Sequence, residues 1–589
     1  MVAEWVAPDG RPARAARWMR AMARNVPTGP YRVGCETGLP VPGGDGVPLV
    51  TDHYFPRGDG APPAGGESPQ RPGEFPTVLV RSPYGRGVPW ASLYGIPLAE
   101  HGFHVVVQSC RGTGGAGGAF HLWRNEAADG RATVAWLRRQ PWFNGALGTI
   151  GASYLGYTQW ALALEPPPEL RAMVVQLGLH DPHAYFHTGG AVHLENALVS
   201  GVGMAYQHQG WWPFLRAALR LRRWLPGAHR EPAPYTSGPA AELPWLAEAL
   251  ERTDGTDPYW RGASAEAAAE HPAVPTCLIA GWQDVFLDQN LAQYRRLHRA
   301  GRETALLVGP WTHHSALQQG APEVFAESLA WLRAHLYGER AGLRPTPVRI
   351  HVGGAGGAGG AGGDGRDGRD GQDGVGDAGD GWRDLAEWPP TAGAGEPWYL
   401  HPGGRLERRR TDGSGPVGEF RHDPAEPTPS LGGPLLSGAA GRRDNRTLEA
   451  RPDVLTFTGP VLTEPLEVLG PVAARMRVTA AGPGGAPAGR PFDVFARLCD
   501  VDGRGRSVNV CDGLVRVAAP GGAAEPPEVM VPMSATAHRF AAGHRVRLQV
   551  SGGAFPRYAP PTGAPDDDGA PAGPVRIALH PGSTLELPT

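Results

Sequence analysis

The sequence predicts an α/β domain that is interrupted by a block of helices and followed by an all-β sandwich domain. Three observations carry this prediction. Short apolar runs alternate with helical segments up to about residue 180 and again after residue 272. The stretch between them is rich in tryptophan and arginine, and its helical pieces are interrupted by prolines. Beyond Trp398, short alternating segments are separated by glycine and proline turns, which is typical of a jelly-roll sandwich.

The composition limits the classes of partner. The chain has 589 residues, enough for about three domains with sizeable cores. Its 55 basic and 58 acidic residues leave a net charge of −3, which gives no electrostatic footprint for nucleic acid or for an anionic membrane. Every basic residue is arginine. Together with 86 glycines and 62 prolines this indicates a coding bias, so the arginine clusters carry little functional information.

Neither a disulfide scaffold nor a metal site is predicted. The five cysteines are widely separated and form no CxxC pair. No metal-ligand spacing recurs, and we expect no cofactor. Residues 1–30 form a predicted helical extension without the apolar run of a signal peptide, and no stretch is long enough to span a bilayer. We therefore expect a cytoplasmic protein. The sequence leaves its oligomeric state open, with a homodimer among the options.

The first part of the α/β domain covers residues 31–180. A hairpin is expected over 41–56, where a Gly-Gly-Asp-Gly turn separates two apolar segments. The apolar runs 77–80 and 104–108 predict strands that are buried on both faces of a parallel sheet. A helix over 126–140 and a later strand continue the alternation that is typical of this fold class.

The helical block, residues 181–272, predicts a cap inserted into the sheet domain. Its clearest helices are expected over 211–225 and 245–252. The sheet then resumes over 273–345, where two further apolar strands and a long helix are expected.

Residues 346–589 are assigned to the C-terminal jelly-roll domain. The Gly/Asp-rich tract 353–381 interrupts a predicted strand pair, formed by 348–352 and the residues from 382 onward. A collagen helix would need proline in this tract, and a phosphate-binding loop would need lysine and an adjoining strand. We therefore expect a flexible insertion within the last domain.

The stretch GTIGASYLGY, residues 148–157, places Ser153 where a short apolar strand turns sharply into a helix. This is the position of a nucleophile elbow, in which glycines relieve crowding and the serine hydroxyl is exposed above the sheet. The helix N-terminus behind the serine favours the negative charge of acyl transfer. The second glycine, Gly156, comes one residue later than in the usual G-x-S-x-G pattern. Alone, the stretch is equally consistent with an ordinary strand-to-helix turn.

Two later strand ends supply an acid and a base. Asp284 follows one buried strand in GWQD, and His313 follows the next in GPWTH. Catalytic groups of open α/β sheets gather at these carboxyl ends. The order Ser, Asp, His is that of α/β-hydrolases, and the long first interval fits an insertion before the acid. Separately, the two residues could be a helix cap and a loop histidine. Their conjunction with Ser153 favours the catalytic interpretation.

Further motifs make the pattern specific. RSPY (81–84) and CRGTGGAGGAF (110–120) precede GASYLG, GWQDVF and GPWTHH, while SVNVCDGLVR (507–516) and TAHRFAAGHRVRLQVS (536–551) follow in the β segment. Together they resemble the motif series of the cocaine-esterase and X-Pro dipeptidyl-peptidase (CocE/NonD) family of serine hydrolases. The resemblance covers nearly everything from about residue 40 onward, except the glycine tract. It implies an α/β-hydrolase domain, a helical cap and a C-terminal jelly roll, and the late glycine is a feature of that family.

Carried over by position, the resemblance implies that Ser153 attacks the acyl carbon, His313 takes and returns its proton, and Asp284 orients the imidazole. His314 is a rival for the base, and only the family pattern G-P-W-[S/T]-H favours His313.

The resemblance also implies an oxyanion hole. It would combine the backbone N–H of Tyr154 with the phenol of Tyr84, which follows the strand 77–80. The alternative is that Tyr84 is simply a tyrosine at the rim of the site.

The acyl group is predicted to be uncharged. Family members that act on α-amino acyl substrates place carboxylates near the ammonium group, in some cases directly after the catalytic acid. Here Asp284 is followed by three apolar residues. Aromatic side chains could line an apolar pocket, although such spacing also occurs in plain helix packing; the candidates are Trp282, Phe286, Trp311, Trp211 and Trp212.

These observations predict a hydrolase of small carboxylic esters, with amides as a further substrate class. The alternative within the family is an X-Pro dipeptidyl-peptidase or amino-acyl hydrolase, which would need an acidic residue of the cap, such as Glu195, to face the site. An alternative from another class is a glycan-binding or scaffold protein with an idle hydrolase domain. The intact serine, acid and histidine set argues against it.

Overall fold

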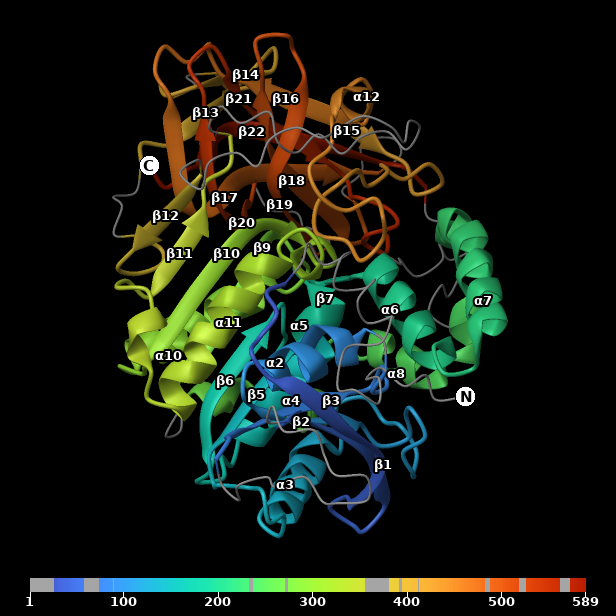
Figure 1. Cartoon of the computed structure of the whole chain (residues 1–589). Coiled ribbons are helices and arrows are strands. Elements are labelled where there is room, and N and C mark those ends of the chain that lie inside the picture. The colour runs from blue at the N-terminus through green and yellow to red at the C-terminus, as the bar shows by residue number, and fades with distance from the viewer. Residues whose placement is uncertain are drawn as a thin grey trace, which may run out of the picture.

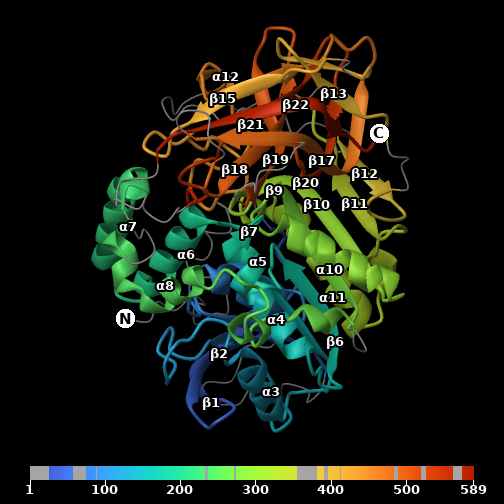
Figure 2. The same cartoon turned by 180° about the vertical axis from the view of Figure 1, so that it is seen from behind.

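The computed structural model describes residues 26–57, 74–87, 89–231, 237–270, 274–354, 381–390, 395–410, 413–482, 488–518, 526–561 and 573–589. The predicted N-terminal helix and nearly all of the Gly/Asp-rich tract lie outside these residues. The described chain forms an α/β domain and an all-β domain, each built on a large sheet (Figures 1 and 2).

The sheet of the α/β domain is parallel in its centre and antiparallel at both edges. Its described strands are β1 (Arg32–Pro42), β2 (Pro48–Arg57), β3 (Thr77–Ser82), β4 (His104–Ser109), β5 (Leu147–Ala152), β6 (Leu170–Gln176), β9 (Thr276–Gln283), β10 (Thr304–Thr312), β11 (Val348–His351) and β12 (Trp382–Leu385). They lie in the order β1-β2-β4-β3-β5-β6-β9-β10-β11-β12. Neighbours are parallel from β4 to β11. The predicted strands and the first hairpin are therefore confirmed.

Helices cover both faces of this sheet because alternate residues of its strands point to opposite sides. Val105 and Val107 of β4 join one core, and Val106 joins the other. The first core contains residues of α2 (Ile96–Glu100) and α11 (Ala321–Leu336), and the second contains residues of α3 (Glu126–Leu137), α4 (Tyr154–Ala163) and α10 (Leu287–Arg299). Buried aliphatic side chains of this kind each contribute about 1.5–3 kcal/mol to folding. The two cores thus fix the carboxyl ends of the strands, where the candidate residues lie.

The boundary predicted at residue 345 needs a correction. The predicted strand pair exists as β11 and β12, which are antiparallel to each other. However, β11 is parallel to β10, with Leu306 opposite Val348, so the pair extends the α/β sheet and does not belong to the last domain. Two short strands carry no signal of the sheet that they join, which explains the error.

The segment between β6 and β9 is mostly helical, as predicted, with one short two-stranded sheet formed by β7 (His187–Thr188) and β8 (Ala191–Val192). It contains α5 (Pro182–Phe186), α6 (Leu194–Tyr206), α7 (Trp211–Trp224), α8 (Pro244–Glu251) and α9 (Pro258–Arg261). The helices α5 and α9 each begin with an Asp-Pro pair, in which Asp181 and Asp257 accept a hydrogen bond from a backbone N–H two residues later. Figures 1 and 2 show α6, α7 and α8 on one flank of the molecule. In the described part of the chain, no helix is long and apolar enough to cross a membrane.

The second domain is all-β. Its described strands are β13 (Trp398–His401), β14 (Arg405–Glu407), β15 (Gly418–His422), β16 (Val454–Thr458), β17 (Leu466–Ala481), β18 (Phe492–Val501), β19 (Ser507–Val517), β20 (Glu528–Phe540), β21 (Arg545–Ser551) and β22 (Val575–Glu586). Along β17, buried and partly exposed residues alternate, so one face covers a core.

The β sheet nearly closes on itself. It runs from β19 through β18, β21, β16, β14, β13, β22 and β17 to β20. The two end strands approach closely, because a Cβ atom at Gly513 of β19 would lie 2.0 Å from the carbonyl oxygen of Pro532 in β20. The domain meets the carboxyl end of the α/β sheet, where the Gln283 amide of β9 donates to the Val510 carbonyl at 2.8 Å.

Candidate active site

Ser153 occupies a strained turn between strand and helix. β5 ends at Ala152 and α4 begins at Tyr154, and the serine between them has φ 61° and ψ −126°. A positive φ in a residue other than glycine is uncommon and is held in place by the surrounding structure. This is the backbone geometry expected of a nucleophile elbow.

The two flanking glycines explain the unusual spacing. A Cβ atom at Gly151 would lie 2.4 Å from the Cβ of Leu155, the residue that replaces the usual glycine. A Cβ atom at Gly156 would lie 2.7 Å from the Cα of Gly178, which follows β6. The late glycine therefore allows α4 to pack directly against the chain beyond β6. Compared with the usual G-x-S-x-G pattern, the helix residue that makes this close contact lies one position later.

Tyr84 lies beside the serine. Its phenol oxygen is 3.4 Å from Ser153 Oγ, and it also accepts a hydrogen bond from the backbone N–H of Tyr154. Burial raises the pKa of the Tyr84 phenol, although the hydrogen bonds with Ser153 and Tyr154 oppose this effect. The phenol therefore keeps its proton at neutral pH, and it lies with the Tyr154 N–H next to the serine hydroxyl.

An acid and a histidine meet at the ends of two neighbouring parallel strands. Asp284 follows β9 and His313 follows β10. His313 Nδ1 lies 2.6 Å from Asp284 Oδ1, and the Phe286 backbone N–H donates to Asp284 Oδ2 at 3.2 Å. Both side chains are buried. An imidazole held in this way by a carboxylate has a fixed orientation.

The rival histidine points elsewhere. His314 Nε2 lies 2.9 Å from the backbone carbonyl oxygen of Leu436, in a loop of the β domain. Its imidazole is thus committed to a contact between the two domains, and His313 is the neighbour that pairs with the acid.

Comparisons with known proteins match both domains. Residues 45–315 match X-Pro dipeptidyl-peptidase (S15 family), and residues 366–584 match the X-Pro dipeptidyl-peptidase C-terminal non-catalytic domain. The cocaine esterase of Rhodococcus sp. (strain MB1 Bresler) is 29% identical over 564 residues, which cover 88% of this chain and 90% of that protein. The chain belongs to the cocaine-esterase and X-Pro dipeptidyl-peptidase family. Members of this family are esterases and peptidases, so the protein is a hydrolase.

Solved structures of similar hydrolases share the fold. An α-amino acid ester hydrolase has a TM-score of 0.72 and 20% identity, with 100% of both chains covered. A CocE/NonD family hydrolase from Staphylococcus aureus has a TM-score of 0.63 and 17% identity, with 96% of this chain and 98% of that chain covered. The sheet domain is thus α/β-hydrolase-like, as the motifs of this family predict.

Of the aromatic residues predicted to line a pocket, only Phe286 contacts the pair formed by His313 and Asp284. Its ring centroid is 5.4 Å from that of His313. Trp282 packs on Trp388 and donates its indole N–H to the His351 carbonyl at 2.7 Å, which directs it toward the edge of the sheet.

Trp311 is also a structural residue. Cβ atoms at Gly309 and Gly320 would lie 2.4 Å from its indole ring, so the ring covers both glycines and fills the core beside Trp382. The position of Trp311 next to a candidate motif predicts a pocket residue, but the strand there also needs a large side chain for its core.

Trp211 and Trp212 are not enclosed either. Each is 67% exposed at the start of α7, so these two side chains lie on the surface of the helical segment. Helical periodicity alone did not show which face of α7 meets the protein.

Sequence reasoning missed residues that the fold brings to the site. The ring of Tyr185 in α5 lies 5.0 Å from that of Phe286, and its hydroxyl donates to Ser200 Oγ at 2.9 Å. Leu436 packs against the same core, and its backbone N–H donates to Asn196 Oδ1 in α6 at 3.0 Å. No motif marks these residues, because their contacts join segments that are far apart in the sequence.

Glu195, the acidic residue considered for an amine-binding site, is already partnered. It is buried at the start of α6, where its carboxylate bonds with Ser437 and lies near the charge of Arg557. Burial raises the pKa of Glu195, and both partners oppose this effect. Both belong to the β domain, so the carboxylate serves the contact between domains.

Proposed function

We propose that Ser153, His313 and Asp284 form a catalytic triad that hydrolyses carboxylic esters of small, uncharged acyl groups. The observation that carries this proposal is the strained serine with a protonated phenol and a backbone N–H beside its hydroxyl. The His313–Asp284 pair at the adjoining strand ends supports it. This set supplies a nucleophile, an oriented base and two donors for an oxyanion.

The reaction then proceeds in two halves. His313 Nε2 accepts the hydroxyl proton of Ser153 while Oγ attacks the acyl carbon, and the carbonyl oxygen becomes an oxyanion that accepts from the Tyr84 phenol and the Tyr154 N–H. The imidazolium returns the proton to the leaving alcohol as the C–O bond breaks, which leaves an acyl-serine. Water then attacks the acyl-serine and gives a proton to His313. When this second tetrahedral intermediate breaks down, His313 returns the proton to Ser153 Oγ, and the carboxylic acid and the free serine are released. Asp284 stabilises the imidazolium throughout.

The side chains around the pair favour an uncharged acyl group. The Phe286 ring lies beside His313, the Tyr185 ring packs on Phe286, and Leu436 packs against the same core. Glu195, the acidic residue of α6, is engaged by Ser437 and Arg557. An ammonium group would therefore lack a free carboxylate from Glu195.

We also propose the finer architecture that the motifs imply. The helices α5–α9 act as a cap, which is supported by their insertion between β6 and β9 and by the contact of Tyr185 with Phe286. The β domain is a jelly-roll sandwich, which is supported by its alternating buried face and nearly closed sheet.

The test is hydrolysis of p-nitrophenyl acetate, butyrate and benzoate, and of Gly-Pro-p-nitroanilide, by the wild type and by Ser153→Ala, His313→Gln and His314→Gln. We expect ester turnover that falls about 10⁴- to 10⁶-fold in the first two variants and persists in His314→Gln. A preference for the anilide would move the enzyme to the dipeptidyl-peptidase branch. Wild-type rates in Ser153→Ala would overturn the site assignment.

A further inference from the structure

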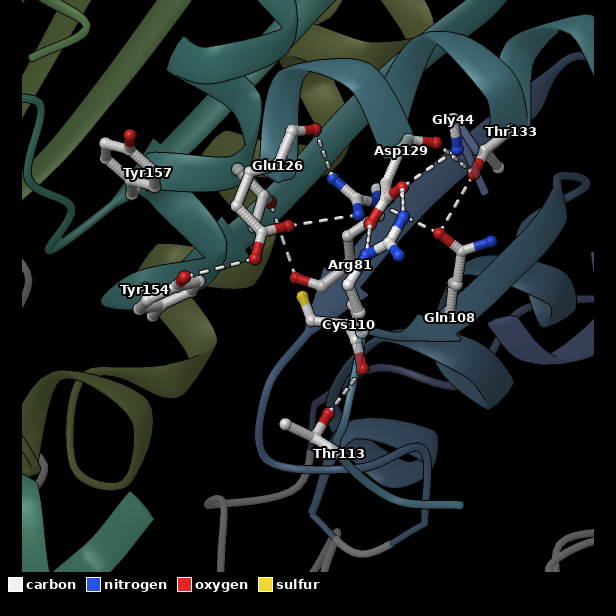
Figure 3. A network of polar contacts seen from close by, with 12 residues as sticks. Gly44, Arg81, Gln108, Cys110, Thr113, Glu126, Asp129, Thr133, Tyr154 and Tyr157 are labelled. Atoms are coloured by element: carbon white, nitrogen blue, oxygen red, sulfur yellow. Dashed lines mark hydrogen bonds and ion pairs between the residues drawn. The ribbon is translucent and has the colours of Figure 1, made fainter. Parts of the chain in front are cut away.

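A buried polar network lies beneath the nucleophile elbow (Figure 3). At its centre, Glu126 of α3 accepts a hydrogen bond from the phenol of Tyr154 at 3.1 Å. Its other carboxylate oxygen lies 3.0 Å from a guanidinium nitrogen of Arg81, at ion-pair distance although not aligned as a hydrogen bond. Both charged side chains are buried. The proposed reaction uses neither side chain. A well-packed apolar pair would stabilise the fold to the same extent, so stability alone does not explain why this ion pair is buried here.

The first branch of the network holds Tyr154. Its phenol donates to Glu126 and accepts the backbone N–H of Trp123 at 3.1 Å, and its ring stacks on Trp123 with 4.6 Å between centroids. Tyr154 is the first residue of α4, and its own backbone N–H is the proposed oxyanion donor. Fixing the far end of the side chain limits how the first turn of α4 can rotate, and so fixes the direction of that N–H.

The second branch holds the segment that carries Tyr84. Arg81 donates to the Glu126 carbonyl at 2.7 Å and to the Gln108 side chain at 2.9 Å. Its own carbonyl accepts from the Thr158 hydroxyl of α4 at 3.4 Å. Arg81 lies near the end of β3, and the chain reaches Tyr84 three residues later. The guanidinium therefore fixes where the chain leaves the strand and where the phenol of Tyr84 lies.

Backbone strain gathers at the same place. Among the described residues, the positive-φ residues other than glycine are Trp123, Ser153 and Leu177. Trp123 donates to the Tyr154 phenol, and the Leu177 carbonyl accepts the Ser153 N–H at 3.2 Å. Strained backbone persists only where its surroundings hold it, so the elbow needs the support that the network supplies.

We propose that Glu126 is the positioning residue of the oxyanion hole. One carboxylate holds both donors, Tyr154 directly through its phenol and Tyr84 through Arg81. This inference rests on the proposed function, since an oxyanion must form at Ser153 for the two donors to matter. It assigns to the α3 carboxylate a role in catalysis without contact with the substrate.

Glu126→Gln tests the proposal, because the amide keeps the size of the side chain and removes the charge that faces Arg81. Active enzyme is counted by titration of Ser153 with a fluorophosphonate probe, and kcat for p-nitrophenyl butyrate is expressed per titrated serine. We expect kcat per site to fall about tenfold or more, since small displacements of catalytic groups have effects of this size. KM should change less than twofold. The affinity for benzeneboronic acid, whose serine adduct mimics the tetrahedral intermediate, should fall by the same factor as kcat/KM.

Tyr154→Phe tests the direct branch even if Glu126→Gln fails to fold. It removes only the phenol that Glu126 holds and leaves the backbone N–H. We expect kcat per site to fall in this variant too, and Glu126→Gln to have a smaller effect in the Tyr154→Phe background than in the wild type, because the two side chains share one contact.

The control is Glu327→Gln in α11, where a carboxylate of the same domain pairs with Arg344 at 2.7 Å. It should lower the unfolding temperature and leave kcat per site unchanged. If Glu126→Gln and Tyr154→Phe lower only the titrated fraction, or keep kcat per site within twofold of the wild type, the positioning role is wrong. If the wild type is neither labelled by the probe nor active on esters, the proposed function is wrong, and so is the inference that rests on it.

Discussion

The phenol of Tyr84 combines two properties that an oxyanion donor needs. It lies 3.4 Å from Ser153 Oγ, and burial raises its pKa above the ordinary value of 10.0. A neutral phenol can donate to an oxyanion, whereas a phenolate would repel it. Because a raised pKa extends the pH range in which the proton is kept, ionisation of Tyr84 should not limit activity below pH 10.

Tyr84→Phe should therefore lower kcat about 10²- to 10³-fold, equivalent to about 3 kcal/mol of transition-state stabilisation, with little change in KM. The loss should be equal at pH 7 and pH 9.5, since the phenol is protonated at both. Steady-state kinetics of ester hydrolysis at the two pH values provide the measurement. A wild-type rate that declines between pH 8 and 9.5, in a step that Tyr84→Phe abolishes, would contradict the raised pKa.

At the scale of the element, the packing of α4 on β6 depends on Gly156. A Cβ atom there would meet the Cα of Gly178 at 2.7 Å and a methyl group of Val175 at 3.1 Å. The first contact is with backbone, which cannot move without shifting the segment after β6. Gly156→Ala should therefore lower the free energy of unfolding by about 1–3 kcal/mol through overpacking, and should displace Ser153 enough to reduce kcat.

Gly203 provides the matched control for this helix glycine. It lies within α6, and a Cβ atom there would meet nothing within 4 Å. Gly203→Ala should raise the free energy of unfolding by about 0.5–1 kcal/mol, because alanine favours a helix over glycine. Denaturant unfolding of both variants gives the comparison. If both substitutions changed the free energy of unfolding in the same direction, the close approach at Gly156 would not determine the stability of this packing.

The sequence predicted elements whose signal lies within a short stretch. Apolar runs marked the strands, and the turns after them placed Ser153, Asp284 and His313 at strand ends, where the structure has them. The choice between the two adjacent histidines depends on a carbonyl in another domain, that of Leu436. No pattern within one segment could have supplied it.

Aromatic residues were harder to interpret for the same reason. Trp282 and Trp311 lie beside the motifs that carry the candidate residues, yet both fill structural positions, while Tyr185 reaches Phe286 from a helix with no motif. A large ring can line a pocket or fill a core equally well. Its neighbours across the fold decide between these roles, and these neighbours come from distant parts of the chain.

At the scale of the whole molecule, the two domains meet around the candidate site. Leu436 of the β domain contacts His314 through its carbonyl and Asn196 of α6 through its N–H. Gln283, the residue before Asp284, bonds with Val510 in β19. The β domain therefore helps to fix the segments that carry the acid and the histidine, and loss of this interface should inactivate the enzyme before the α/β core unfolds.

Buried histidines make the fold as a whole sensitive to acid. Burial lowers the pKa of His104 to about 3, and has the same effect at other sites in both domains; these are His180 and His193, with pKa about 3, and His187 and His422, with pKa about 4. For His104 the geometry gives an independent reason, because its Nδ1 lies 3.0 Å from His53 Nε2 and only one proton fits between them.

The direction of the effect on stability follows from proton binding. In the unfolded chain these histidines take up protons near pH 6.5, whereas in the folded protein they stay neutral to about pH 3–4. Stability is therefore full above pH 6.5 and falls as the pH is lowered toward the folded pKa values. At pH 5 each such histidine lowers the free energy of unfolding by about 2 kcal/mol, so the five together approach the whole stability of an ordinary domain.

We therefore expect the unfolding temperature to decrease steeply between pH 6.5 and pH 4.5. His104→Asn should flatten this decrease, because the amide N–H₂ group can replace the Nδ1–H of His104 as the donor to His53 Nε2 and does not titrate. Differential scanning calorimetry of both proteins at several pH values tests this. If the two proteins lose stability in parallel as the pH falls, His104 does not contribute, and the acid sensitivity must then arise from other groups.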